Sequence, residues 1–76
     1  MGMLTAKQEK LLVLFRRAVQ RERETQRAYS RMLGLNDDPT IKHIIETFIG
    51  QEKQHEETLL KIYKELRTTG EFRDAT

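Results

Sequence analysis

A single interruption divides this sequence into two long helical segments. The stretch from Gly34 to Pro39 combines a glycine typical of a helix C-terminus, the carboxylate of Asp38 as a cap for the next helix, and a proline at that helix's first position. Ahead of the first segment, Thr5 and Gln8 have the spacing of a capping box. The sequence therefore predicts one helix over about 6–33.

The second helix is predicted over about 39–67 and is followed by a polar tail over 68–76. A connection this short makes two helices antiparallel neighbours, so the expected fold is all-α, an antiparallel hairpin forming one domain over 1–76. A chain of 76 residues buries too little surface to be stable alone, and it has no cysteine for a disulfide. A partner subunit or a metal must therefore supply the missing stability.

Each predicted helix carries a seam of apolar residues spaced alternately by four and three. In the first helix the seam is Leu11, Phe15, Ala18, Glu22, Thr25, Tyr29 and Met32. In the second helix it is Ile41, Ile45, Phe48, Glu52, His55, Leu59, Ile62 and Leu66. The ionisable members Glu22, Glu52 and His55 interrupt these otherwise core-like seams.

The hairpin brings these ionisable residues to one level. If the chain folds about position 37, Glu22 lies opposite Glu52 and Tyr29 opposite Ile45. Burying unpaired carboxylates costs several kcal/mol, so a cation must lie among them. Glu52 and His55, three residues apart, point the same way and can bind one ion. Two chains would offer four Glu and two His, the ligand set of a di-metal carboxylate bundle.

Overall charge argues against several other kinds of partner. The 14 basic and 12 acidic residues nearly balance, and acidic residues interrupt the one arginine-rich stretch, so nucleic-acid binding is not expected. The longest apolar run, 11–15, is too short to span a membrane or to form a signal core. A cytoplasmic location is therefore expected.

The pattern resembles the ferritin-like proteins, including rubrerythrins, and most closely the encapsulated ferritins. The resemblance covers roughly 17–67 and rests on Glu22 with Tyr29, on the Asp38-Pro39 helix start, on Glu52-x-x-His55 and on the interval between the two glutamates. It implies a half-ferritin hairpin that dimerises, or assembles further, into a four-helix bundle. It also implies iron ligands at Glu22, Glu52 and His55, with Tyr29 as their hydrogen-bond partner and two iron ions per dimer.

The activity implied by this resemblance is that of a ferroxidase, which oxidises Fe(II) to Fe(III) for iron storage or detoxification. Glu24 and Glu56 are candidate accessory ligands, and an encapsulin shell is a candidate partner and compartment. The chain departs from encapsulated ferritins in having Ala28 where they have an aromatic residue and Arg21 where they have an acidic one. Their further C-terminal helix and shell-docking tail are not recognisable after Arg67.

Two alternatives remain at this stage. In a non-enzymatic homo-oligomeric helical module, the three ionisable residues could form a structural metal site, or Glu52 and His55 could be a buried polar pair that fixes register. A rubrerythrin-like peroxidase is the other, although such enzymes usually carry a cysteine-ligated iron that this chain cannot supply. A carboxylate-rich, histidine-poor ligand set favours iron oxidation.

Overall fold

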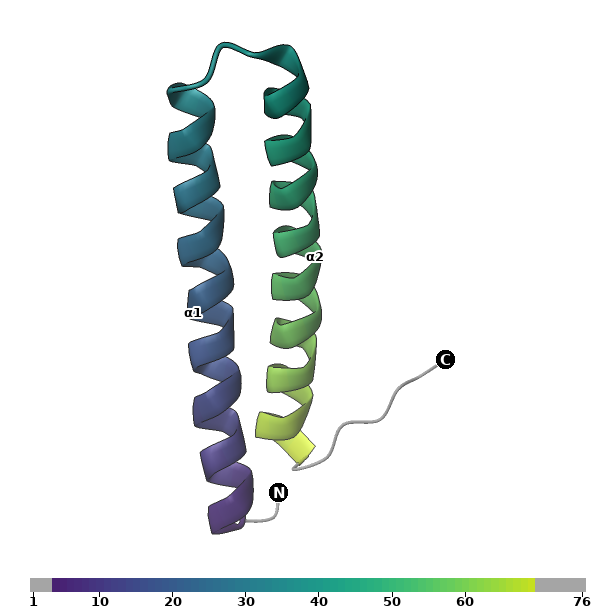
Figure 1. Ribbon diagram of the computed structural model, residues 1–76. Helices are drawn as coiled ribbons and strands as arrows, with labels where there is room; N and C mark the ends of the chain where they lie inside the picture. Colours follow the sequence, from purple (N-terminus) through teal and green to yellow (C-terminus); the bar gives the residue numbers. More distant parts are fainter. Residues whose placement is uncertain (1–3, 70–76) are drawn as a thin grey trace.

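The computed structural model describes residues 4–69 and shows an antiparallel pair of long helices. Helix α1 comprises Ala6–Gly34 and helix α2 comprises Pro39–Thr69. The helices lie side by side and are joined at one end by a short connection (Figure 1). The predicted all-α hairpin is thus confirmed for one chain.

The start of α1 has the capping box that the sequence predicts. The Thr5 hydroxyl accepts a hydrogen bond from the Gln8 backbone N–H at 3.1 Å. In return, the Gln8 side-chain oxygen accepts one from the Thr5 N–H at 2.7 Å. Two backbone donors that a helix start leaves without intrahelical partners are thereby satisfied.

The connection ends α1 differently from the sequence prediction. Gly34 is still helical, and Leu35 caps the helix in a right-handed conformation with φ −104° and ψ 0°. Its N–H donates to the Met32 carbonyl at 3.1 Å, which closes the helix with a tight turn. The predicted position of Gly34 just beyond the helix end is therefore wrong, because Gly34 is itself helical and the closing turn needs no positive φ.

The start of α2 follows the prediction closely. An Asp38 carboxylate oxygen accepts hydrogen bonds from the Thr40 and Ile41 N–H groups at 2.8 and 3.4 Å, and Pro39 is the first helical residue. The helix continues to Thr69, two residues beyond the predicted end, so 68–69 are helical rather than tail. The remainder of the predicted tail, 70–76, lies outside the described residues.

The contact between the helices is rotated relative to the predicted seam of α1. The buried apolar residues are Leu12 and Val19 in α1, and Ile45 and Leu66 in α2. Leu11 and Met32, both assigned to the seam, are 40% and 49% exposed. Tyr29 packs its ring against Phe48, with 5.6 Å between centroids. The predicted seam of α1 therefore lies beside the contact with α2, on one face of the hairpin.

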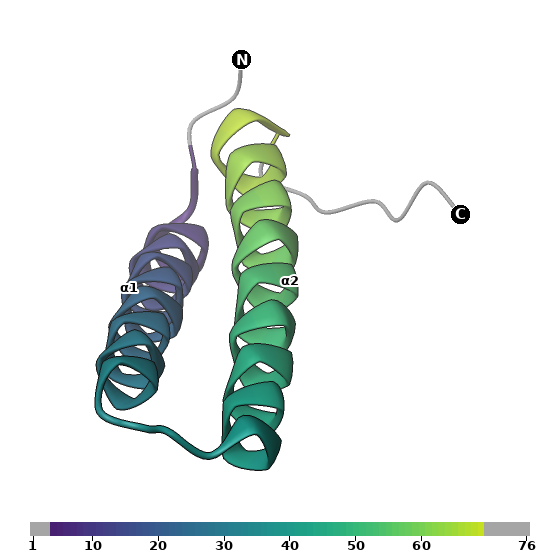
Figure 2. The same cartoon turned by 90° about the horizontal axis from the view of Figure 1, so that it is seen from above.

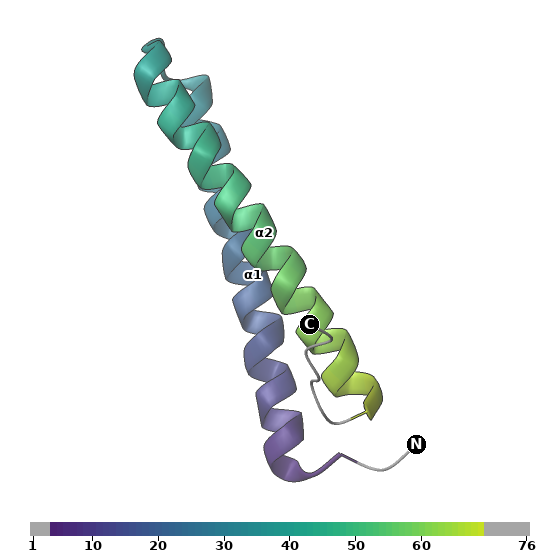
Figure 3. The same ribbon diagram turned by 90° about the vertical axis from the view of Figure 1, so that its right-hand side faces the viewer.

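The hairpin is a single layer with little core of its own. Its extents are 53 × 26 × 14 Å, and the smallest is close to the width of one helix with its side chains. Figures 2 and 3 show the same two helices from above and from the right-hand side of Figure 1. Within residues 4–69 no large side chain is fully buried. Stable domains pack two layers around a core, so one face of this hairpin lacks a covering layer.

Large apolar side chains are exposed along that face. They recur at the three- and four-residue spacing of one helical stripe in each helix: Leu11, Leu14, Met32, Ile41, Ile44 and Phe48. Their exposed fractions lie between 40% and 58%. We call this set the apolar face. Among residues 4–69, no helix combines the length and apolar character needed to cross a membrane.

Candidate metal centre

Glu22, Glu52 and His55 form one cluster between the two helices. One ligand atom from each residue lies within 4.8 Å of those of the other two. The His55 Nδ1 lies 3.8 Å from a Glu22 carboxylate oxygen and 3.9 Å from a Glu52 carboxylate oxygen. The predicted level match across the hairpin is therefore confirmed at these three positions.

Burial differs sharply among the three residues. The side chains of Glu22 and Glu52 are only 22% and 21% exposed, whereas that of His55 is 62% exposed. His55 lies in the α2 stripe that also carries Ile41, Ile44 and Phe48, so the cluster opens on the apolar face. Whatever covers that face would also cover the cluster.

One Glu22 oxygen has no hydrogen-bond partner among residues 4–69. Glu22 Oε2 is buried and accepts no hydrogen bond from any described group. The His55 Nδ1 lies 3.8 Å from this oxygen, which is too long for a hydrogen bond. A buried carboxylate oxygen left in this state is unfavourable by about 1–3 kcal/mol or more. A cation bound beside Glu22 would remove this penalty.

The donor set fits a divalent transition metal. Carboxylate oxygens and an imidazole nitrogen bind such ions at about 2.0–2.2 Å, so two atoms on one ion lie at most about 4.4 Å apart. The two His55 separations fall within that limit, and 4.8 Å for the whole group requires only a small side-chain adjustment. Three ligands from one chain leave coordination positions open, as reactive metal sites do.

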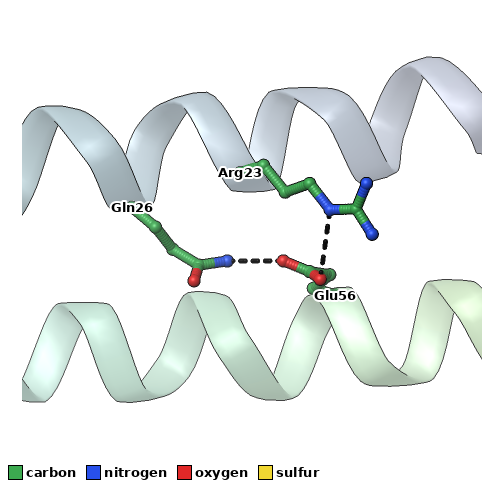
Figure 4. A network of polar contacts seen from close by, with 3 residues as sticks. All are labelled: Arg23, Gln26 and Glu56. Carbon is green, nitrogen blue, oxygen red and sulfur yellow. Dashed lines mark hydrogen bonds and ion pairs between the residues drawn. The ribbon is translucent and has the colours of Figure 1, made fainter.

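A second polar group joins the two helices beside the cluster. Gln26 in α1 donates from its side-chain nitrogen to Glu56 Oε1 at 2.8 Å. Arg23 donates from Nε to Glu56 Oε2 at 3.2 Å and forms an ion pair with it (Figure 4). We call these three residues the Glu56 clamp. It binds α1 to α2 and occupies both oxygens of the Glu56 carboxylate.

The clamp favours the ionised form of Glu56. The hydrogen bond from Gln26 is the largest influence lowering the pKa of Glu56, and the hydrogen bond and charge of Arg23 and the charge of Lys53 lower it further. Partial burial of the carboxyl group acts in the opposite direction, but the pKa remains below its usual value. Glu56 is therefore a carboxylate at neutral pH.

The remaining predicted site residues lie outside the cluster. Glu24 is exposed, and the metal-competent group does not include it. Glu56 is engaged by the clamp rather than directed to the cluster. Tyr29 has its ring against Phe48, and its hydroxyl makes no hydrogen bond to the cluster within residues 4–69. The structure of one chain thus brings together the three predicted ligands, without their predicted accessory partners.

Sequence reasoning missed the clamp. Its signal was present, because Leu12, Val19, Gln26 and Leu33 recur every seven residues and form a second stripe beside the predicted seam. Gln26 interrupts that stripe as Glu22 interrupts the other. A polar residue between apolar heptad positions could have indicated a buried partner on α2.

Comparisons with protein-family models, with curated proteins and with solved structures find no match to this chain. What the cluster does must therefore be inferred from its own geometry and chemistry.

Proposed function

We propose that this protein is a ferritin-like ferroxidase whose di-iron site forms when two hairpins pack together through their apolar faces. Glu22, Glu52 and His55 of each chain hold iron, and the bundle oxidises Fe(II) to Fe(III). The observation that carries this proposal is the cluster itself, in which two largely buried carboxylates and an imidazole meet around an oxygen without a hydrogen-bond partner.

Pairing of two chains would cover the apolar face of each hairpin and complete the metal site. A second hairpin on the apolar face supplies the missing layer and buries exposed residues such as Ile44 and Phe48. It also covers His55 and brings two clusters together. Four carboxylates then balance the charge of two divalent ions, and the ligand set becomes that of a di-metal carboxylate bundle.

The ligand chemistry favours iron oxidation over other roles. Carboxylate oxygens are hard ligands that stabilise Fe(III) relative to Fe(II), and two adjacent ions can deliver two electrons together. Two Fe(II) ions each give up one electron, and with two protons they reduce one O2 to hydrogen peroxide. Covering by the apolar face would keep bulk water from the site.

Aerobic addition of Fe(II) to the full-length chain tests this proposal. We expect Fe(III) absorbance and oxygen consumption to rise faster than in buffer. Glu52→Gln, which keeps the size but removes the charge, should abolish the effect. Glu57→Gln, a matched change at an exposed position of the same helix, should not. Wild-type oxidation rates in Glu52→Gln would overturn the proposal.

A structural metal site would give a different result in the same experiments. Zinc would then bind to the wild-type chain and be lost in Glu52→Gln, while added Fe(II) would oxidise no faster than in buffer. That outcome would establish the cluster as a metal site and reject the ferroxidase activity.

A further inference from the structure

The Glu56 clamp lies close enough to the cluster to act on it. Glu56 follows His55 directly and is one turn from Glu52, while Gln26 is one turn from Glu22. Residues four apart on a helix are neighbours, with about 5–6 Å between their Cβ atoms. Because α1 and α2 are antiparallel, these two turns run in opposite directions along the hairpin, and Gln26 and Glu56 reach each other across the helix contact. The clamp therefore lies beside the cluster on the same helix contact.

A third carboxylate per chain is thus held beside the site by contacts within the protein. Both Glu56 oxygens are occupied, one by Gln26 and one by Arg23. The Arg23 contact runs through Nε alone, and its side chain is 50% exposed. Such an ion pair is screened by solvent and contributes only about 0–1 kcal/mol, so a highly charged ion nearby can compete with it.

Charge balance indicates when such competition would succeed. Two Glu per chain give a dimer four carboxylates, which neutralise two divalent ions but leave two trivalent ions with an excess of positive charge. Adding Glu56 from each chain raises the number to six, which balances two trivalent ions. The number of anionic ligands is a principal determinant of ion affinity in carboxylate sites.

We propose that Glu56 is a withheld ligand of this site, which leaves Arg23 and Gln26 and joins the metal when the bound ion is trivalent. This inference rests on the proposed metal site and adds to it a response to the charge of the ion. Arg23 determines how strongly a metal ion must attract Glu56 before Glu56 leaves the clamp, because Arg23 competes with the metal for the same carboxylate. The site then holds the oxidised product more tightly than the Glu22, Glu52 and His55 set alone would.

Two redox-inert probes separate ion charge from catalysis. Tb(III), followed by its luminescence, reports trivalent binding, and Co(II), followed by its absorption spectrum without oxygen, reports divalent binding. Glu56→Gln should weaken Tb(III) binding by about tenfold or more and leave Co(II) affinity unchanged. Glu57→Gln is the matched control and should change neither affinity.

Arg23→Ala provides a test of opposite sign. Releasing the clamp should strengthen Tb(III) binding, and this gain should vanish when Arg23→Ala is combined with Glu56→Gln. Arg27→Ala, at an exposed arginine one turn further along α1, should have no effect. A purely structural clamp predicts weaker binding of both ions in Arg23→Ala instead.

The results separate failure of this inference from failure of the proposed site. Equal weakening of both ions by Glu56→Gln, or no change in either, overturns the withheld-ligand role while leaving the metal site intact. If Co(II) binding survives Glu52→Gln unchanged, the proposed metal site itself is wrong, and this inference falls with it.

Discussion

Glu22 lowers the stability of the protein when no metal is bound. Its buried oxygen has no hydrogen-bond partner within residues 4–69, and a second carboxylate, that of Glu52, lies in the same cluster. Such an arrangement is unfavourable for stability unless a positive ion joins it. The two carboxylates are thus better explained by function than by packing.

Replacing Glu22 with Leu should therefore stabilise the chelator-treated protein, by about 1–4 kcal/mol, as when buried ionic groups are exchanged for apolar ones. Thermal unfolding without metal measures this change. Glu24→Leu, at an exposed position of the same helix, is the control and should shift stability by no more than about 0.5 kcal/mol. A lower unfolding temperature for Glu22→Leu would mean that the carboxylate is a structural requirement.

Tyr29 should affect reaction rate rather than metal content. Its ring packs against Phe48, and Tyr29→Phe preserves that contact. The variant should therefore bind the same number of metal ions. We expect it to oxidise Fe(II) more slowly, because the proposed dimer, unlike the single chain, would bring the Tyr29 hydroxyl to a metal ligand, and such partners orient ligands without replacing them. Metal analysis and stopped-flow oxidation on the same samples check both parts. Oxidation at the wild-type rate would reduce Tyr29 to a packing role.

Glu56 should make stability fall in acid. The pKa of Glu56 is lowered, first by the hydrogen bond from Gln26 and further by Arg23 and Lys53. A lowered pKa adds stability that is complete above the unfolded-state pKa and is lost as pH falls through the folded-state pKa.

Metal-free wild type should therefore exceed Glu56→Gln in stability by on the order of 1 kcal/mol at neutral pH. This difference should shrink on the acid side of the ordinary glutamate pKa. Unfolding temperatures of both proteins across a pH series measure it. A difference that stays constant into acid would show that ionised Glu56 contributes nothing to folding.

At the scale of the helices, local signals predicted the boundaries well. Thr5 and Asp38 cap their helices as their sequence contexts indicate, because capping depends on neighbouring residues alone. The end of α1 at Gly34 was predicted one residue too early, because the sequence does not distinguish a left-handed glycine cap from a right-handed closing turn at Leu35. Element ends were thus predictable to within two residues.

Which face of α1 meets α2 was not predictable in the same way. Residues 11–15 are all apolar, so helical spacing admits a contact stripe that begins at Leu11 or one that begins at Leu12. The structure uses Leu12 within the hairpin and leaves Leu11 exposed. Glu22 faces the cluster in both cases because it lies near the border of the two stripes. The predicted meeting of the three candidate ligands is therefore confirmed despite the rotated seam.

The Asp38 cap offers a direct test at this scale. Asp38→Ala removes the oxygen that accepts from the Thr40 and Ile41 N–H groups and should reduce stability by about 1 kcal/mol. Asp37→Ala, at the adjacent exposed position, should cost less. Thermal unfolding of the two variants compares them, and equal effects would indicate that the start of α2 does not depend on this cap.

At the scale of the whole molecule, the hairpin is one layer with an uncovered apolar face and an open cluster on it. A second copy would cover both and complete the ligand set. Metal that binds only the assembled state stabilises that state by mass action, so metal and association should depend on each other.

Native mass spectrometry of the full-length chain, titrated anaerobically with Fe(II), tests this coupling most directly. Ile44→Lys on the apolar face should shift the population to metal-free monomer. Val13→Lys is the control and should not, because Val13 lies outside the apolar face, in a hollow that Arg16 and Tyr63 also line. Glu52→Leu should pair without binding iron. We expect the wild-type chain to gain iron as dimers, or assemblies of dimers, with two ions per pair of chains. Iron-loaded monomer, or undiminished iron content in Glu52→Leu, would contradict it.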